Sequence, residues 1–174
     1  MKYKLVIVTP IYEDNEAASR LLSEIRDIFK KEVFVVAIDD GSLINPFCVT
    51  FLNLHKLNGV VLKLKKNVGH QIAIAIGLQY VADQLDWADK IVVMDSDGED
   101  NPQNVSVLLN SSNDEGIDVV VGSRRARFES IQFKFFYNFY RMIFLILTGK
   151  SIGFGNFMCL NLTALKRIVT MPEL

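Results

Sequence analysis

The feature that most constrains this chain is the alternation of short apolar runs, rich in valine and isoleucine, with longer segments of helical period. Strands that are hydrophobic along their whole length are typical of parallel sheets, because such sheets are covered on both faces. The apolar runs predict strands at residues 4–9, 33–39, 60–64, 90–94 and 118–121. We therefore expect an α/β fold in which a mostly parallel sheet carries helices on both faces.

The segments between these runs carry helix signals. One of them has an apolar stripe made of Leu21, Leu22, Ile25, Ile28 and Phe29. Residues 69–83 carry a similar stripe, and Asn101 and Pro102 supply the N-cap and the first residue of a helix that runs to about Ser111. These segments are predicted to be the helices that connect the strands.

Length and charge limit the classes of protein to consider. The 174 residues, 50% of them hydrophobic, suffice for one buried core, so residues 1–174 are expected to form a single domain. A formal net charge of -1 argues against nucleic-acid binding. Cys48 and Cys159 lack the spacing of a disulfide framework or a zinc site, which is typical of a cytoplasmic protein. No apolar run is long enough to predict a transmembrane helix.

Acidic and polar residues follow three of the predicted strands. They are the segments Pro10-Ile11-Tyr12-Glu13-Asp14-Asn15-Glu16, Asp39-Asp40-Gly41-Ser42 and Asp95-Ser96-Asp97-Gly98-Glu99-Asp100. In open α/β sheets ligands bind beyond the carboxyl ends of the strands. We therefore expect these three segments to meet at one edge of the sheet and to form the functional site.

The acidic segment after the fourth strand predicts a metal site. Its carboxylates repel one another unless a cation neutralises them, and Mg2+ or Mn2+ held by one or two carboxylates and by phosphate oxygens is the usual solution. Asp95 and Asp97 are the expected ligands, with Glu99 as a third. The alternative is a solvated turn in which Asp100 or Asn101 caps the next helix. A calcium-binding EF-hand loop is excluded because its sixth residue would be Asp100 instead of glycine.

The other candidates each have a plain alternative. Asp39 and Asp40 can accept hydrogen bonds from a base or a ribose, although Asp-Gly-Ser is also an ordinary turn sequence. Asn67 precedes a predicted helix start that can face phosphate, or it caps that helix. Arg124 can clamp a phosphate, or it is a solvated loop residue. Residues 131–147, apolar nearly all round with a few basic residues, predict contact with a membrane surface or with a partner helix, although part of such a helix also packs on the sheet.

With these positions assigned, the sequence resembles the family 2 glycosyltransferases of the GT-A fold over essentially all 174 residues. The resemblance rests on the order of three motifs: the Pro10 to Glu16 element, Asp39-Asp40-Gly41-Ser42, and Asp95-Ser96-Asp97. It implies a set of roles for residues already singled out. The nucleotide site would be lined by Pro10, Tyr12 and Glu16, base and ribose would be held by Asp39 and Asp40, and Mg2+ or Mn2+ with the diphosphate would be surrounded by Asp95, Asp97 and Glu99.

Within that family the segments 67–71, 122–124 and 139–141 are similar to the polyprenyl-phosphate sugar transferases, the dolichol-phosphate mannose synthase and bactoprenol glucosyltransferase group. This similarity implies inverting transfer from a nucleotide-diphosphate sugar to a polyprenyl phosphate in cell-envelope synthesis. The reaction would run at the cytosolic face of a membrane, with Asp95 and Asp97 as catalytic residues and Arg124 near the acceptor.

The chain departs from that group at Gly155-Asn156-Phe157-Met158, where the relatives often have Gly-Asp-Phe-Arg. An arginine there would help to hold an acceptor phosphate, so its absence makes a glycan acceptor an alternative. The chain also stops where many relatives continue into further helices, which suggests a fragment of a longer membrane enzyme. Two other functions stay open: a non-catalytic domain that binds nucleotide sugars, and Mg2+-dependent aspartyl phosphotransfer. The second requires an aspartate after the first strand, where this chain has Thr9-Pro10.

Overall fold

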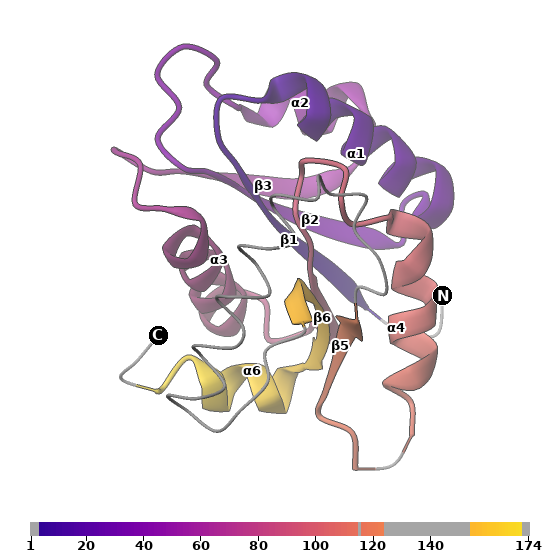
Figure 1. Ribbon diagram of the computed structural model, residues 1–174. Helices are drawn as coiled ribbons and strands as arrows, with labels where there is room; N and C mark the ends of the chain where they lie inside the picture. Colours follow the sequence, from indigo (N-terminus) through magenta and orange to yellow (C-terminus); the bar gives the residue numbers. More distant parts are fainter. Residues whose placement is uncertain (1–3, 115, 124–153, 172–174) are drawn as a thin grey trace, which may run out of the picture.

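The computed structural model describes residues 4–114, 116–123 and 154–171 and contains a six-stranded sheet in the order β3-β2-β1-β4-β6-β5 (Figure 1). The strands are β1 (Leu5–Ile11), β2 (Val33–Asp39), β3 (Asn58–Lys63), β4 (Lys90–Val93), β5 (Val119–Ser123) and β6 (Phe154–Asn161). The first four are parallel, whereas β6 is antiparallel to both of its neighbours, β4 and β5. The predicted α/β fold with a mostly parallel sheet is confirmed.

Helices cover both faces of this sheet (Figure 1). One face packs against α1 (Asn15–Phe29), α2 (Val49–Leu54) and α4 (Val105–Ser111), and the short 3-10 helix η1 (Pro102–Asn104) leads into α4. The other face packs against α3 (His70–Gln84) and α6 (Leu162–Ile168). The two-layer cover explains why the strands are hydrophobic along their whole length.

The central strand β1 shows how the sequence fills both cores. Successive side chains of a strand point to opposite faces. Leu5 and Ile7 accordingly belong to the cluster under α1 and α4, and Val6 and Val8 belong to the cluster under α3. All four side chains are buried, so β1 is fixed in the middle of the sheet and its carboxyl end becomes a rigid support for the residues that follow.

The prediction that Pro10 ends the first strand is wrong, because β1 continues to Ile11 and Pro10 pairs in register with Ile38 of β2. The carbonyl oxygen of Pro10 accepts a hydrogen bond from the Ser96 hydroxyl (2.9 Å), so this edge of the residue faces the β4 side. Pairing between β1 and β4 already ends at Val8. The missing N–H of Pro10 therefore falls where no strand requires it.

All five predicted strands are present, and the strand at residues 33–39 agrees at both ends. The predicted helix start is also confirmed, because the side chain of Asn101 accepts a hydrogen bond from the backbone N–H of Gln103 (2.8 Å). The prediction missed α2, β6 and α6. The β6 segment contains Gly155 and Asn156, which are typical of loops, and it is stabilised as a strand by pairing with β4 and β5 on its two sides.

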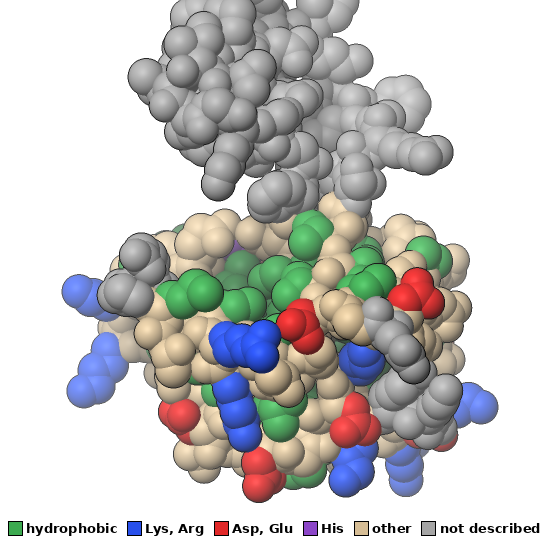
Figure 2. All heavy atoms as spheres, turned by 90° about the horizontal axis from the view of Figure 1, so that it is seen from below, with side chains coloured by type: hydrophobic (Ala, Val, Ile, Leu, Met, Phe, Trp, Pro, Cys, Tyr) green, Lys and Arg blue, Asp and Glu red, His purple; other side chains and the backbone are tan. Residues whose placement is uncertain are grey.

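The described surface is mixed in charge. The face seen from below carries acidic and basic side chains interspersed around hydrophobic ones (Figure 2), in line with the near balance of charges in the sequence. Among the described residues, none of the helices has both the length and the apolar character needed to cross a bilayer. The segment 131–147, predicted to contact a membrane surface, lies outside the described residues.

Candidate active site

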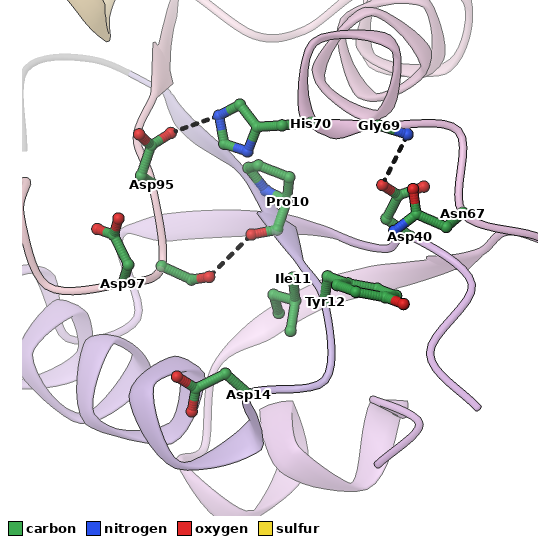
Figure 3. Close-up of a pocket in the computed structure, with 11 residues that line it drawn as sticks. Pro10, Ile11, Tyr12, Asp14, Asp40, Asn67, Gly69, His70, Asp95 and Asp97 are labelled. Carbon is green, nitrogen blue, oxygen red and sulfur yellow. Dashed lines mark hydrogen bonds and ion pairs between the residues drawn. The ribbon is translucent and has the colours of Figure 1, made fainter. Parts of the chain in front are cut away.

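A pocket of about 450 Å³ lies at the carboxyl ends of β1, β2 and β4, next to the start of α3 (Figure 3). It is lined by Pro10, Ile11, Tyr12, Asp14, Asp40, Asn67, Gly69, His70, Asp95, Ser96 and Asp97. The three segments that the sequence predicted to converge do meet here. Figure 3 shows Asp95 and Asp97 on one side of the pocket and Tyr12, Asp40 and Asn67 on the other.

The acidic loop after β4 is held by its own hydrogen bonds. The buried Asp100 accepts a hydrogen bond from the backbone N–H of Asp95 through Oδ2 (2.9 Å), and Asp97 accepts one from the backbone N–H of Glu99 through Oδ1 (2.9 Å). Ser96 ties the loop to β1 through the carbonyl oxygen of Pro10. These contacts place the carboxylates of Asp95 and Asp97 at the pocket, whereas Glu99 is exposed and is not among the lining residues.

The residues present can take part in a metal site without completing it. Within the described ranges, no group of three or more His, Cys, Asp or Glu side chains is placed to hold a metal ion. Two carboxylates on one pocket wall nevertheless fit a hard divalent cation whose other ligands are phosphate oxygens of a substrate and water. The donor set of Asp95 and Asp97 therefore suits Mg2+ or Mn2+ in the presence of a nucleotide.

His70 is a pocket residue that the sequence analysis did not include among its predicted site residues. Its Nε2 lies 3.0 Å from Oδ1 of Asp95 and 2.8 Å from the side-chain amide of Asn156 on β6. The Asn156 amide also accepts a hydrogen bond from the side chain of Gln71 (3.0 Å). This ring nitrogen therefore lies between the acidic loop after β4 and the antiparallel strand β6, where it donates to Asp95 when protonated and accepts from Asn156 when not. The position of His70 at a helix start was the only signal in the sequence, and it did not reveal these partners.

The two aspartates at the end of β2 have different positions. Asp39 is buried, and its carboxylate accepts hydrogen bonds from the backbone N–H groups of Ser42 (3.0 Å) and Phe47 (3.1 Å). It lies outside the residues that line the pocket and holds the loop between β2 and α2. Asp40 lines the pocket, and its carboxylate accepts hydrogen bonds from the backbone N–H groups of Val68 (2.8 Å) and Gly69 (3.1 Å).

Only some residues of the segment after β1 line the pocket, as at the end of β2. Tyr12 lines the pocket with about half of its surface exposed (52%). Asp14, which was not predicted as a site residue, also lines the pocket while its carboxylate caps α1 at the N–H of Ala17 (2.9 Å). Glu16 pairs with Arg20 on the exposed side of α1 and is not among the lining residues. Arg124, predicted to contact the acceptor, lies outside the described residues.

The fold and the pocket together define an α/β domain of the GT-A type, with an acidic loop after the fourth strand. The chain belongs to Glycosyl transferase family 2, which matches residues 6–167. This assignment confirms the family resemblance seen in the sequence, although not the narrower similarity to the polyprenyl-phosphate sugar transferases.

Solved structures share the fold of this chain. A mannosyltransferase from Pyrobaculum calidifontis, in complex with GDP-Man and Mn2+, is similar with a TM-score of 0.62 and 14% identity, over 97% of this chain and 47% of its own. Glucosyl-3-phosphoglycerate synthase from Mycobacterium tuberculosis, in complex with UDP, is similar with a TM-score of 0.66 and 16% identity, over 93% of this chain and 58% of its own. Mannosyl-3-phosphoglycerate synthase from Rubrobacter xylanophilus is similar with a TM-score of 0.67 and 14% identity, over 92% of this chain and 53% of its own. The chain spans about half the length of these proteins.

Proposed function

We propose that residues 1–174 form one glycosyltransferase domain that transfers a hexose from a nucleotide-diphosphate sugar to an acceptor with inversion at the anomeric carbon. The observation that carries this proposal is the division of a single pocket: the acidic pair Asp95 and Asp97 lies on one side and Tyr12, Asp40 and Asn67 lie on the other. A nucleotide-diphosphate sugar has the matching division into a base with its ribose and a charged diphosphate.

On the side of Tyr12, the pocket offers groups that suit a nucleoside. Tyr12 provides a half-exposed aromatic ring on which a base can stack. The carboxylate of Asp40 uses both oxygens on backbone N–H groups, and each oxygen retains acceptor capacity for a ribose hydroxyl or a base N–H. Asn67 adds an amide that both donates and accepts. The predicted roles of Asp39 and Glu16 as ligand-binding residues are less well supported, because neither lines the pocket.

On the side of the acidic pair, Asp95 and Asp97 would hold Mg2+ or Mn2+, with Glu99 as the further predicted ligand. The bound cation would neutralise the negative charge that develops on the leaving nucleoside diphosphate. The chain itself holds these groups in place before the substrate binds. Asp100 and Ser96 fix the backbone of the loop, His70 contacts the carboxylate of Asp95, and the N–H of Glu99 holds that of Asp97. Such preorganisation lowers the free energy needed to arrange charges during the reaction.

The acceptor is proposed to be a polyprenyl phosphate or a glycan in cell-envelope synthesis at the cytosolic face of a membrane. The motifs shared with the dolichol-phosphate mannose synthase group favour the first. Met158, at the position of that group's arginine, packs with the cluster under α3 and α6 and cannot bind a phosphate. Transfer to undecaprenyl phosphate, measured against transfer to an oligosaccharide, distinguishes the two acceptors.

The donor is tested by thermal-shift and calorimetric titration with UDP- and GDP-sugars, with and without Mn2+. We expect stabilisation by one class of sugar nucleotide, with dependence on the metal. Asp97→Asn should abolish this dependence, whereas the matched control Asp27→Asn, on the exposed face of α1, should retain it. Equal stabilisation in excess chelator would contradict the proposed metal role.

Two further results would replace the proposal. Tight binding of a sugar nucleotide with neither transfer nor slow hydrolysis, for every acceptor tried, would assign a non-catalytic binding domain. Stable modification of Asp95 by beryllofluoride would assign aspartyl phosphotransfer.

A further inference from the structure

Two adjacent aliphatic side chains project into solvent from the loop between β2 and α2. Leu43 is 86% exposed and Ile44 is 83% exposed, the two highest values among the large hydrophobic residues of the described part of the chain. Single exposed aliphatic residues are common on soluble proteins, but two neighbours at this exposure form a small apolar protrusion. We call these two residues the 43–44 tip.

The tip is held in place by hydrogen bonds to Glu13 in the neighbouring loop, and we call this set of contacts the Glu13 buttress. The carboxylate of Glu13 accepts hydrogen bonds from three consecutive backbone N–H groups, those of Leu43 (2.6 Å), Ile44 (3.1 Å) and Asn45 (2.7 Å). The side chain of Asn45 donates to the carbonyl oxygen of Glu13 (3.3 Å), and the N–H of Glu13 donates to the hydroxyl of Ser42 (2.9 Å). The tip is thus presented on a fixed backbone instead of a loose loop.

This arrangement includes a strained residue. Glu13 has a φ of 55°, in the left-handed region that side chains with a Cβ atom seldom adopt. Such strain is retained only where the surrounding contacts over-determine it. The hydrogen bonds that hold Glu13 in this conformation also keep Leu43 and Ile44 exposed. At this exposure the two side chains bury little apolar surface within the protein. An external apolar partner would account for the arrangement.

Position and charge indicate what that partner is. Glu13 directly follows the pocket residue Tyr12, so the tip is anchored at the pocket mouth. On its other side Gly41 packs against the backbone of Lys66, because a Cβ atom at Gly41 would come within 2.2 Å of the Lys66 carbonyl carbon. Lys65 and Lys66 are both exposed. Two exposed aliphatic residues, on a loop that packs at Gly41 against a segment with two exposed lysines, match a lipid surface that is apolar below and anionic above.

We propose that the 43–44 tip inserts into the headgroup region of an anionic lipid bilayer, with Lys65 and Lys66 on the anionic headgroups, and that this contact sets the pocket mouth at the membrane surface. The contact is separate from the one predicted for residues 131–147. It does not depend on whether the domain transfers sugar.

The first experiment reads the position of the tip directly. In the full chain with Trp87→Phe, the only native tryptophan is removed and Leu43→Trp supplies a single reporter. With vesicles of phosphatidylcholine and phosphatidylglycerol, we expect a blue shift of its emission and quenching by brominated lipid. The matched control is Val107→Trp, since Val107 is an exposed aliphatic residue of α4 (61%). Absence of both signals from the Leu43→Trp reporter would overturn the proposal, even if the protein binds the vesicles elsewhere.

The second experiment measures vesicle affinity by sedimentation. Leu43→Ser with Ile44→Ser should weaken binding by at least about tenfold, because it removes two aliphatic side chains that would be buried in the bilayer. Lys65→Gln and Lys66→Gln should each weaken it by about fivefold at low salt, and hardly at all at high salt. Val107→Ser should leave binding unchanged, and a urea unfolding midpoint equal to that of the wild type shows that each variant is folded. A blue shift of the Leu43→Trp emission that depends on protein concentration, without lipid, would assign the tip to contact between two copies of the chain and overturn the proposal.

Discussion

Oδ2 of Asp40, at the end of β2, lies 3.1 Å from the backbone nitrogen of Gly69, the residue that precedes α3. Gly69 has a φ of 92°, and the start of α3 has no side-chain cap hydrogen bond, so Asp40 fixes the backbone just before the helix instead of capping its first turn. Oδ1 of the same carboxylate accepts the N–H of Val68. The negative charge also lies at the end of α3 that carries the positive part of the helix dipole. Asp40 therefore joins the side of the pocket that contains Tyr12 and Asn67 to the helix that supplies His70.

Asp40→Asn should destabilise the protein, because an amide group replaces one of two oxygens that accept backbone N–H groups. We expect a loss of about 1–3 kcal/mol in the free energy of unfolding, which is the effect of leaving a buried N–H unsatisfied. Urea denaturation measures it. Asp83→Asn is the control, since Asp83 bonds only to the exposed side chain of Gln79 among its described contacts. Equal stability of the two variants would show that the bonds of Asp40 to Val68 and Gly69 do not stabilise the segment before α3.

Gly41→Ala should be more harmful than Gly116→Ala. Both glycines have positive φ, 71° and 85°, so alanine costs roughly 1–2 kcal/mol at either position. Only at Gly41 would the added Cβ meet backbone atoms, those of Lys66 and Asn67, whereas nothing lies within 4 Å at Gly116. We expect a further loss of about 1–3 kcal/mol for Gly41→Ala, and weaker nucleotide binding because Asn67 must move. Comparable melting temperatures would contradict the close approach of the two loops.

Much of the fold and part of the site were predictable from local pattern. Five apolar runs marked the strands, and the parallel sheet they imply brings strand ends to one edge. That reasoning correctly brought together the segments containing Tyr12, Asp40 and Asp95. Asp39 was also expected to hold the base or ribose, but it is not among the residues that line the pocket, because neighbouring side chains of a strand point to opposite faces. Asp39 follows the face of Val35 and Ala37 into the core, and Asp40 turns towards α3.

What local pattern could not supply were contacts between distant segments. His70 and Asn156 are 86 residues apart, and neither has neighbours in the sequence that indicate the other. Strand β6 forms because β4 and β5 flank it, so its identity depends on the assembled sheet. The Glu13 buttress is similar: in the sequence Glu13 is one of several acidic residues in the segment after β1, and only the structure shows its three N–H partners.

Asn156→Ala should weaken Mn2+ binding in the presence of a nucleotide. The side chain of Asn156 contacts Nε2 of His70, and that nitrogen also contacts Oδ1 of Asp95. Without the Asn156 side chain, the imidazole ring is free to turn away from the Asp95 carboxylate. Groups that orient metal ligands change metal affinity by about tenfold or more. Electron paramagnetic resonance of free Mn2+ measures the affinity without a turnover assay. Gln79→Ala is the control, because it removes a comparable side-chain bond elsewhere on α3, and an equal affinity in both variants would exclude a positioning role.

Acid should loosen the 43–44 tip. Hydrogen bonds from the backbone N–H groups of Asn45, Leu43 and Ile44 lower the pKa of Glu13. A carboxyl group whose pKa is lower in the folded state stabilises that state above its unfolded pKa, and this contribution is lost as the pH falls through the folded value. Hydrogen exchange at residues 43–45 should therefore lose protection below about pH 4, after correction for the intrinsic rate. Glu13→Gln should exchange faster at neutral pH and lose this pH dependence, because the amide keeps one acceptor and carries no charge. An ordinary Glu13 pKa in an NMR titration would contradict the buttress.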